Sequence, residues 1–139
     1  MKASHLVGKR LAFITDCIAE IRQLAQPERL LTDKVQQRFV EHTLQIAIQS
    51  MLDVAFAIAS EANLGEPAES RQVFDRLAAA GWIPPAMSDM CRRMVAFRNV
   101  VVHRYLQVDP AIVQRIVARD LDDLLGFVRV LRDRLGITG

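Results

Sequence analysis

LQIAIQSMLDVAFAIA, residues 44–59, is the most apolar stretch of a 139-residue chain, and it is the strongest indication of the fold. The apolar residues do not alternate as in a strand; they lie nearly all round a helix. Such a helix has to be covered on more than one side, by its own bundle and, we expect, by a second copy of the chain. Its one polar column consists of Gln45, Gln49 and Asp53, which follow one another at steps of four residues.

The ends of this helix are marked in the sequence. Thr32 and Asp33 offer an N-cap, and Leu64 with Gly65 offers a left-handed stop, so we predict a helix over residues 33–63, about 45 Å long. The sequence leaves two possible environments open for Asp53 in this helix. If Asp53 is buried, it needs a partner, and we propose Arg98; otherwise it faces water.

Along the rest of the chain, the same periodicity predicts an all-α antiparallel bundle of about five helices, forming a single domain over residues 1–139. The other expected helices cover residues 4–26, closed by Pro27; residues 71–80, capped by Ser70 and ended by Gly81; a segment that starts at Pro84 and Pro85; and a segment from the Asp109 N-cap and Pro110 to Gly136. Val100, Val101 and Val102 also suit a strand. The apolar stripe of Met90, Met94, Phe97 and Val101 runs through them without a break, which favours helix.

Composition limits the classes of protein to which the chain can belong. With 51% hydrophobic and 24% charged residues, it is a folded globular protein. A net charge of +2 permits nucleic-acid binding without requiring it. Neither a signal peptide nor a membrane span is expected, because the apolar window is short and interrupted by polar residues. Cys17 and Cys91 have no CxxC spacing and are expected to be free core thiols, so we expect a cytoplasmic protein.

Several motifs are absent from the sequence. It contains no GxxxxGK[ST], no GxGxxG, no HExxH and no CxxC. His5, His42 and His103 lie far apart, and none has a His or Cys three or four residues later. We therefore expect neither a metal site nor a cofactor of the protein's own.

The candidate site is the segment RNVVVHRY, residues 98–105. On a helix, Asn99 and His103 form one column, while Arg98 and Tyr105, seven residues apart, form an adjacent one. Residues 91–106 include Arg104 as a supporting charge, contain no acid and carry a formal charge of +4. A fixed cation, an amide, an imidazole and a phenol on one face suit a phosphate-containing ligand.

This segment resembles the R-x4-H-x-Y motif of the HEPN superfamily, in the form found in HepT-type ribonuclease toxins. The resemblance covers roughly residues 5 to 130. The segments that carry it, in order, are VEHTLQIAIQ from Val40, LDVA from Leu52, LGEP from Leu64, LAAAG from Leu77 and FRN from Phe97. His42 stands where arginine is expected in many members, which affects at most a neighbouring contact.

The resemblance implies a homodimer in which two copies of the motif meet in a cleft, and metal-independent cleavage of RNA. The 2'-OH attacks its own phosphate, so the protein has only to move protons and stabilise negative charge. His103 would be the general acid and base, Arg98 would hold the phosphate, and Asn99 would orient the phosphate or His103. The alternative is that His103 is a structural histidine of the bundle with no catalytic role.

The resemblance also implies a regulator of the enzyme. In the family, a minimal nucleotidyltransferase antitoxin transfers AMP to the tyrosine of the motif, here Tyr105, and the ATP and magnesium belong to that partner. The alternative is a tyrosine simply packed at the helix end. We expect RNA as the substrate and no role for DNA. Two other functions remain open: a non-catalytic dimeric module that binds a nucleotide or RNA, and a purely structural interaction protein.

Overall fold

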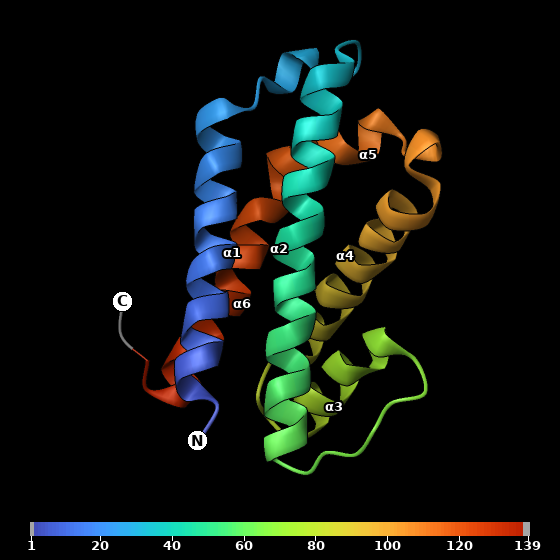
Figure 1. The fold of residues 1–139 in the computed structure, drawn as a ribbon. Helices are drawn as coiled ribbons and strands as arrows, with labels where there is room; N and C mark the ends of the chain where they lie inside the picture. Colours follow the sequence, from blue (N-terminus) through green and yellow to red (C-terminus); the bar gives the residue numbers. More distant parts are fainter. Residues whose placement is uncertain (1, 138–139) are drawn as a thin grey trace.

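The computed structural model describes residues 2–137, and its regular structure there is helical throughout. The predicted all-α class is confirmed (Figure 1), and the alternative of a strand at residues 100–102 is wrong because they belong to a helix. The α-helices are α1 (Ser4–Leu24), α2 (Lys34–Glu61), α3 (Val73–Ala79), α4 (Pro85–Arg104), α5 (Pro110–Arg115) and α6 (Leu121–Leu135). Short 3-10 turns cover Pro27–Arg29, Ser70–Gln72 and Tyr105–Gln107, and a π turn covers Ile116–Asp120.

Helix α2 is the centre of the bundle. Asp33 is its N-cap, as predicted, and its carboxylate accepts hydrogen bonds from the backbone N–H groups of Val35 and Gln36. Over 28 residues the helix is about 42 Å long. It packs against α1, α3, α4 and α5. Most of its apolar circumference is therefore covered within one protomer, without a second copy.

The length and mean hydropathy of α2 would allow it to cross a membrane, contrary to our expectation that its apolar stretch is too short. In the structure, however, 61% of that apolar window is buried inside the protein. The helix also buries Gln37, Glu41, Thr43 and Ser50. These features describe the central helix of a bundle, which satisfies the same length and composition test.

Two predicted helix ends differ from the structure. Ser70 is not a cap: Glu69 is the N-cap of the turn before α3, in a reciprocal capping box with Gln72. The expected single helix from Asp109 onward is interrupted by the π turn between α5 and α6. Ile112 in α5 is 39% exposed. At the far end, Gly136 adopts a left-handed φ of 67° just after α6, as predicted.

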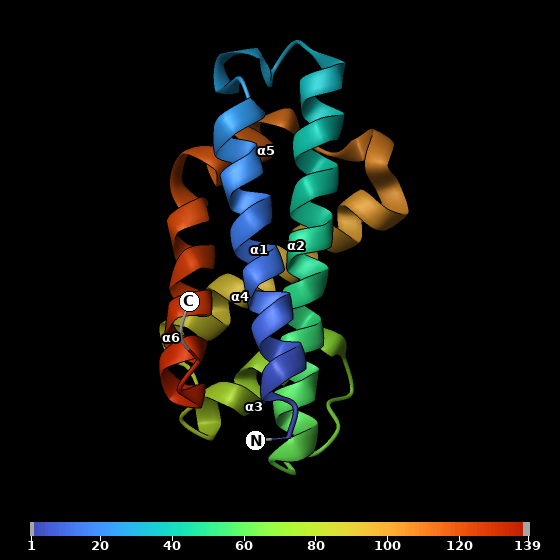
Figure 2. The same cartoon turned by 60° about the vertical axis from the view of Figure 1, so that its left-hand side comes forward.

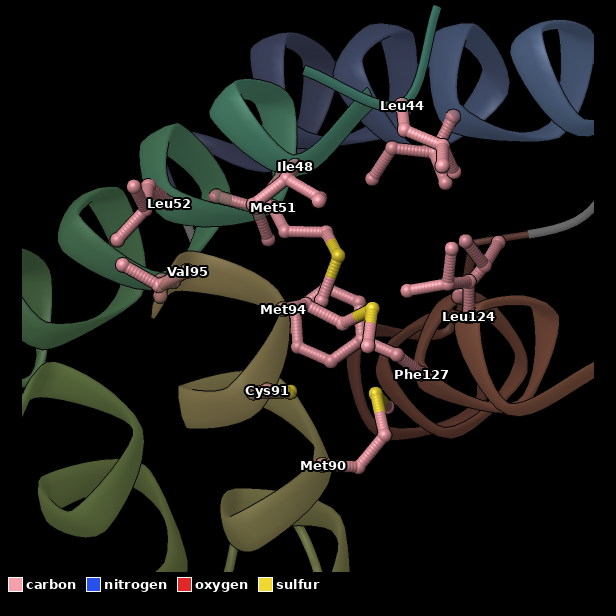
Figure 3. Close-up of a cluster of buried hydrophobic side chains, with 14 of the residues drawn as sticks. Leu44, Ile48, Met51, Leu52, Met90, Cys91, Met94, Val95, Leu124 and Phe127 are labelled. Atoms are coloured by element: carbon pink, nitrogen blue, oxygen red, sulfur yellow. The ribbon is translucent and has the colours of Figure 1, made fainter. Parts of the chain in front are cut away.

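The core is formed by buried side chains of α1, α2, α3, α4 and α6, and one part of it lies between α2, α4 and α6 (Figure 3). Figure 3 shows Met51, Met94 and Phe127 pointing toward one another from these three helices. The rings of Phe127 and Phe74 meet edge to face, with centroids 6.1 Å apart. Methionine side chains adapt to the irregular gaps between helices that cross at different angles.

Both cysteines are free and buried, as predicted. Burial, followed by the charges of Glu20 and Asp16, raises the pKa of Cys17 to about 11. Burial alone raises the pKa of Cys91 far above its usual range. Neither thiol is therefore a reactive nucleophile near neutral pH.

The C-terminal end of α4 stands apart from the rest of the bundle. In Figure 2, this end and the turn that follows project away from the other helices. Side chains there are correspondingly open to solvent: Leu106 is 75% exposed and Tyr105 is 54% exposed. The segment that we single out as the candidate site therefore lies on a projecting corner, where another molecule can reach it.

Candidate active site

Helix α4 presents the predicted motif on two sides. Arg98 is half-buried and turns toward α2, whereas Asn99, His103 and Arg104 are exposed. Tyr105 lies in the 3-10 turn just past the helix and also turns toward α2. The two predicted columns therefore exist, but one faces α2 and the other faces solvent.

Two hydrogen bonds hold the guanidinium of Arg98. Its Nη2 donates to Oε1 of Gln49 on α2, and its Nη1 donates to Oδ1 of Asn99 at 2.8 Å. Its Nε is buried and has no hydrogen-bond partner within residues 2–137. Each Nη carries two N–H groups, so one of each is left for an anion. This arrangement suits a bidentate contact with two phosphate oxygens.

The predicted pairing of Asp53 with Arg98 is wrong. Asp53 is not deeply buried: its side chain is 38% exposed, and its Oδ2 lies 3.8 Å from Nη1 of Arg10. Its Oδ1 accepts a hydrogen bond of 3.0 Å from Nε2 of Gln49. Gln49 therefore stands between the two residues that we expected to meet, because Asp53 and Arg98 lie too far apart for direct contact and an amide bridges them.

Tyr105 has its own contact with α2. The guanidinium of Arg38 lies over its ring, 5.5 Å from the centroid. Arg38 in turn donates to Oε1 of Glu41 at 2.9 Å. Glu41 is only 2% exposed, and burial raises the pKa of its carboxyl group despite the opposing effect of Arg38.

Sequence reasoning missed several residues of this arrangement. Gln49 was noticed as part of a polar column and not as a neighbour of Arg98, while Arg10, Arg38 and Glu41 were not singled out. A signal was present for Gln49, since a polar residue within the most apolar helix needs a polar partner. The structure joins Arg98 to Asn99 by a hydrogen bond but gives His103 and Arg104 no such contact with either of them.

A cavity of about 460 Å³ lies against another side of α4. Its walls are largely apolar and include Phe97, Val100 and the π-turn residue Ile116. Asp120, also in the π turn, lines it, and burial raises the pKa of that carboxyl group while Arg93 opposes the shift. Within residues 2–137, no group of three or more His, Cys, Asp or Glu side chains is arranged to hold a metal ion.

Comparison with known proteins identifies the family. The family model described as Ribonuclease HepT-like matches residues 14–131, which is most of the chain. The protein belongs to the HepT-like ribonuclease family. The predicted resemblance is thereby confirmed, and with it the predicted enzyme class, an endoribonuclease.

The relatives of this HepT-like protein agree with that assignment. The mRNA nuclease HepT of Shewanella oneidensis is 30% identical over 130 residues, which cover 93% of this chain and 98% of the relative. A solved structure of a tri-AMPylated Shewanella oneidensis HEPN toxin with an MNT antitoxin superimposes with a TM-score of 0.85 at 30% identity, covering 91% of this chain and 96% of that one. A toxin-antitoxin structure with AMP-PNP has a TM-score of 0.88 at 29% identity, covering 94% and 99%.

Proposed function

We propose that this HepT-like ribonuclease is the toxin of a toxin-antitoxin pair and cleaves RNA without a metal ion, at a cleft shared by two copies of the chain. One observation carries the proposal: the guanidinium of Arg98 is fixed beside Asn99, and the exposed imidazole of His103 follows one turn later on the same helix. A fixed phosphate-binding cation with an accessible proton carrier nearby is what RNA transesterification requires.

The proposed reaction needs only proton transfer and charge stabilisation. The 2'-oxygen of a ribose attacks the adjacent phosphorus, and the bond from phosphorus to the 5'-oxygen breaks. The imidazole of His103 takes the proton from the 2'-OH, and a protonated imidazole gives a proton to the leaving 5'-oxygen. Arg98 holds the non-bridging oxygens on which negative charge develops. The products are a 2',3'-cyclic phosphate and a 5'-hydroxyl.

The need for a second copy rests on the geometry of α4. Arg98 faces α2, and His103 lies on the solvent side, so one protomer does not enclose a phosphate by itself. Two copies that meet at the projecting ends of α4 would bring two imidazoles to one cleft, one to accept a proton and the other to donate it. Light scattering on the purified protein should give twice the mass of one chain.

Tyr105 is the proposed point of control. Tyr105 is 54% exposed, and a similar Shewanella oneidensis toxin is tri-AMPylated in complex with an MNT antitoxin. Transfer of AMP from ATP to the phenol, with release of pyrophosphate, would add bulk and negative charge close to Arg98. The ATP and magnesium would belong to a minimal nucleotidyltransferase partner. Mass spectrometry after incubation with that partner should show AMP added to the wild type and no addition at residue 105 in Tyr105→Phe.

The proposed activity is tested with single-stranded RNA and three variants. Arg98→Ala and His103→Ala should abolish cleavage without loss of folding, while Arg129→Ala, an exposed arginine of α6, should cleave like the wild type. Loss of one such group typically lowers the rate by about 10² to 10³. The non-catalytic binding module would be favoured instead if the wild type bound RNA without cutting it and the His103→Ala variant bound RNA with the same affinity.

A further inference from the structure

We infer that Gln49 is a positioning residue for the proposed reaction: its amide, held in one orientation by Asp53, fixes the guanidinium of Arg98 at the phosphate site. The inference rests on the proposed ribonuclease function and adds a residue from α2 to a site otherwise built on α4. Gln49 is half-buried and lies on the face of α2 that meets Arg98.

The two neighbours of Gln49 determine how its amide points. A guanidinium can only donate hydrogen bonds, and an ionised carboxylate can only accept them. Gln49 stands between one of each: its Oε1 accepts from Nη2 of Arg98, and its Nε2 donates to Oδ1 of Asp53 at 3.0 Å. Turning the amide over would place oxygen against oxygen and N–H against N–H. Asp53 therefore fixes the side of Gln49 that Arg98 meets.

Arg98 depends on this contact for its position. Its two hydrogen bonds go to Asn99, its neighbour on α4, and to Gln49 on α2. Its Nε is buried and makes no third hydrogen bond to the part of the chain that the structure describes. Gln49 is thus the residue that ties the guanidinium to a second helix. Without that tie, the guanidinium would swing about its neighbour and lose the alignment that phosphate binding in the transition state requires.

Arg10 lies next to Asp53, at the end of the series of contacts that links Asp53, Gln49 and Arg98. Its Nη1 lies 3.8 Å from Oδ2 of Asp53, and the two side chains are 47% and 38% exposed. An ion pair this open to water contributes little to stability, so Arg10 should have only a weak effect on the position of Asp53. The position of Arg98 therefore depends mainly on two hydrogen bonds: Gln49 donates one to Asp53 and accepts the other from Arg98.

A test uses variants that keep the size of Gln49 and change its hydrogen bonding. Gln49→Met removes both bonds and should lower the single-turnover rate of RNA cleavage at saturating RNA by about 10²-fold. The Kd for RNA should change much less, because Arg98 keeps its charge. Gln45→Met, one turn earlier on the same polar column, is the matched control and should cleave like the wild type.

Exchanging the carboxylate and the amide gives a rescue experiment. Gln49→Glu alone places two carboxylates side by side and should cleave slowly. In the double variant Gln49→Glu with Asp53→Asn, the new asparagine can donate to the new glutamate, which still accepts from Arg98. This pair should recover the rate to within about 10-fold of the wild type, a result that a purely structural role does not predict. If Gln49→Met fails to fold, this comparison still decides.

Two results would overturn the inference. One is cleavage by Gln49→Met at the wild-type rate while Arg98→Ala is inactive, which leaves the proposed function standing. The other is full additivity of Gln49→Met with Arg98→Lys, a variant that keeps the charge and that we expect to keep part of the activity, because the effects of residues that act through one another are not additive. A wild type that fails to cleave RNA would remove the proposed function and this inference together.

Discussion

The guanidinium of Arg38 lies over the ring of Tyr105, with its carbon 5.5 Å from the ring centroid. This contact joins the end of the motif to α2, as the hydrogen bond between Arg98 and Gln49 does seven residues earlier. Helix α2 therefore supports the motif at two points, although the motif itself lies on α4 and the turn after it.

Arg38→Ala should reduce the free energy of unfolding near pH 7 by about 1–3 kcal/mol, because it leaves the buried carboxylate of Glu41 without its partner. The loss should shrink in acid, where Glu41 takes up a proton. Arg134→Ala is the matched control, since Arg134 lies over the ring of Trp82 at 4.9 Å and has no buried acid beside it. Denaturant unfolding of both variants at several pH values provides the comparison. An equal, pH-independent loss in both would show that Glu41 does not depend on Arg38.

Glu41→Gln should change how stability depends on pH. Burial raises the pKa of Glu41 above its ordinary value of 4.5, so the folded state holds the proton more tightly than the unfolded state does. The stability linked to this group is complete below pH 4.5 and is lost as the pH rises through the folded pKa. Glu41→Gln should therefore match the wild type in acid and be the more stable protein near neutrality, as measured by urea unfolding. A variant that becomes the less stable one as the pH rises would show that attraction by Arg38 outweighs burial.

Phe127→Ala should lower the free energy of unfolding by about 3–5 kcal/mol, because the ring is fully buried and meets Phe74 edge to face. Phe13→Ala, at a position that is 39% exposed, should cost much less. Urea unfolding monitored by circular dichroism measures both. Similar losses in the two variants would contradict the position of Phe127 in the core.

The thiols of Cys17 and Cys91 should resist alkylation by iodoacetamide at pH 8 in the folded protein. The pKa of Cys17 is raised to about 11, and that of Cys91 is also raised, so little thiolate is present, and both side chains are buried. Mass spectrometry should find no adduct on the native chain and two adducts after unfolding in guanidinium chloride. Rapid labelling of either thiol in the native protein would contradict its burial.

Much of the fold can be predicted from the sequence, because its signals are local. The helix ends are marked by the capping carboxylate of Asp33, by Pro85 at the start of α4 and by the left-handed Gly136, and each signal lies within a residue or two of the helix end that it marks. The π turn at Ile116–Asp120 has no comparable signal, since the apolar pattern continues through it. The sequence does not predict the cap at Glu69, because serine is the stronger capping residue by type and Ser70 follows directly. In the structure, the capping box between Glu69 and Gln72 makes Glu69 the N-cap.

The candidate site also has one part that the sequence predicts and one part that it does not. The spacing of Arg98, Asn99, His103 and Tyr105 is a property of one short segment and can be read directly from the sequence. Which residue of α2 meets Arg98 depends on how two distant helices cross, and a shift of one turn along α2 exchanges Asp53 for Gln49. Periodicity gives the polar column but not the register in which α4 meets it.

The most direct test of metal-independent RNA cleavage by this protein is the chemistry of the RNA ends that the wild type leaves in the presence of excess EDTA. Metal-independent transesterification by His103 predicts undiminished cleavage, 2',3'-cyclic phosphate at the upstream end and a 5'-hydroxyl that polynucleotide kinase labels without prior phosphatase treatment, with none of these products from His103→Ala. Cleavage that stops in EDTA, or products that carry 5'-phosphates, would contradict it.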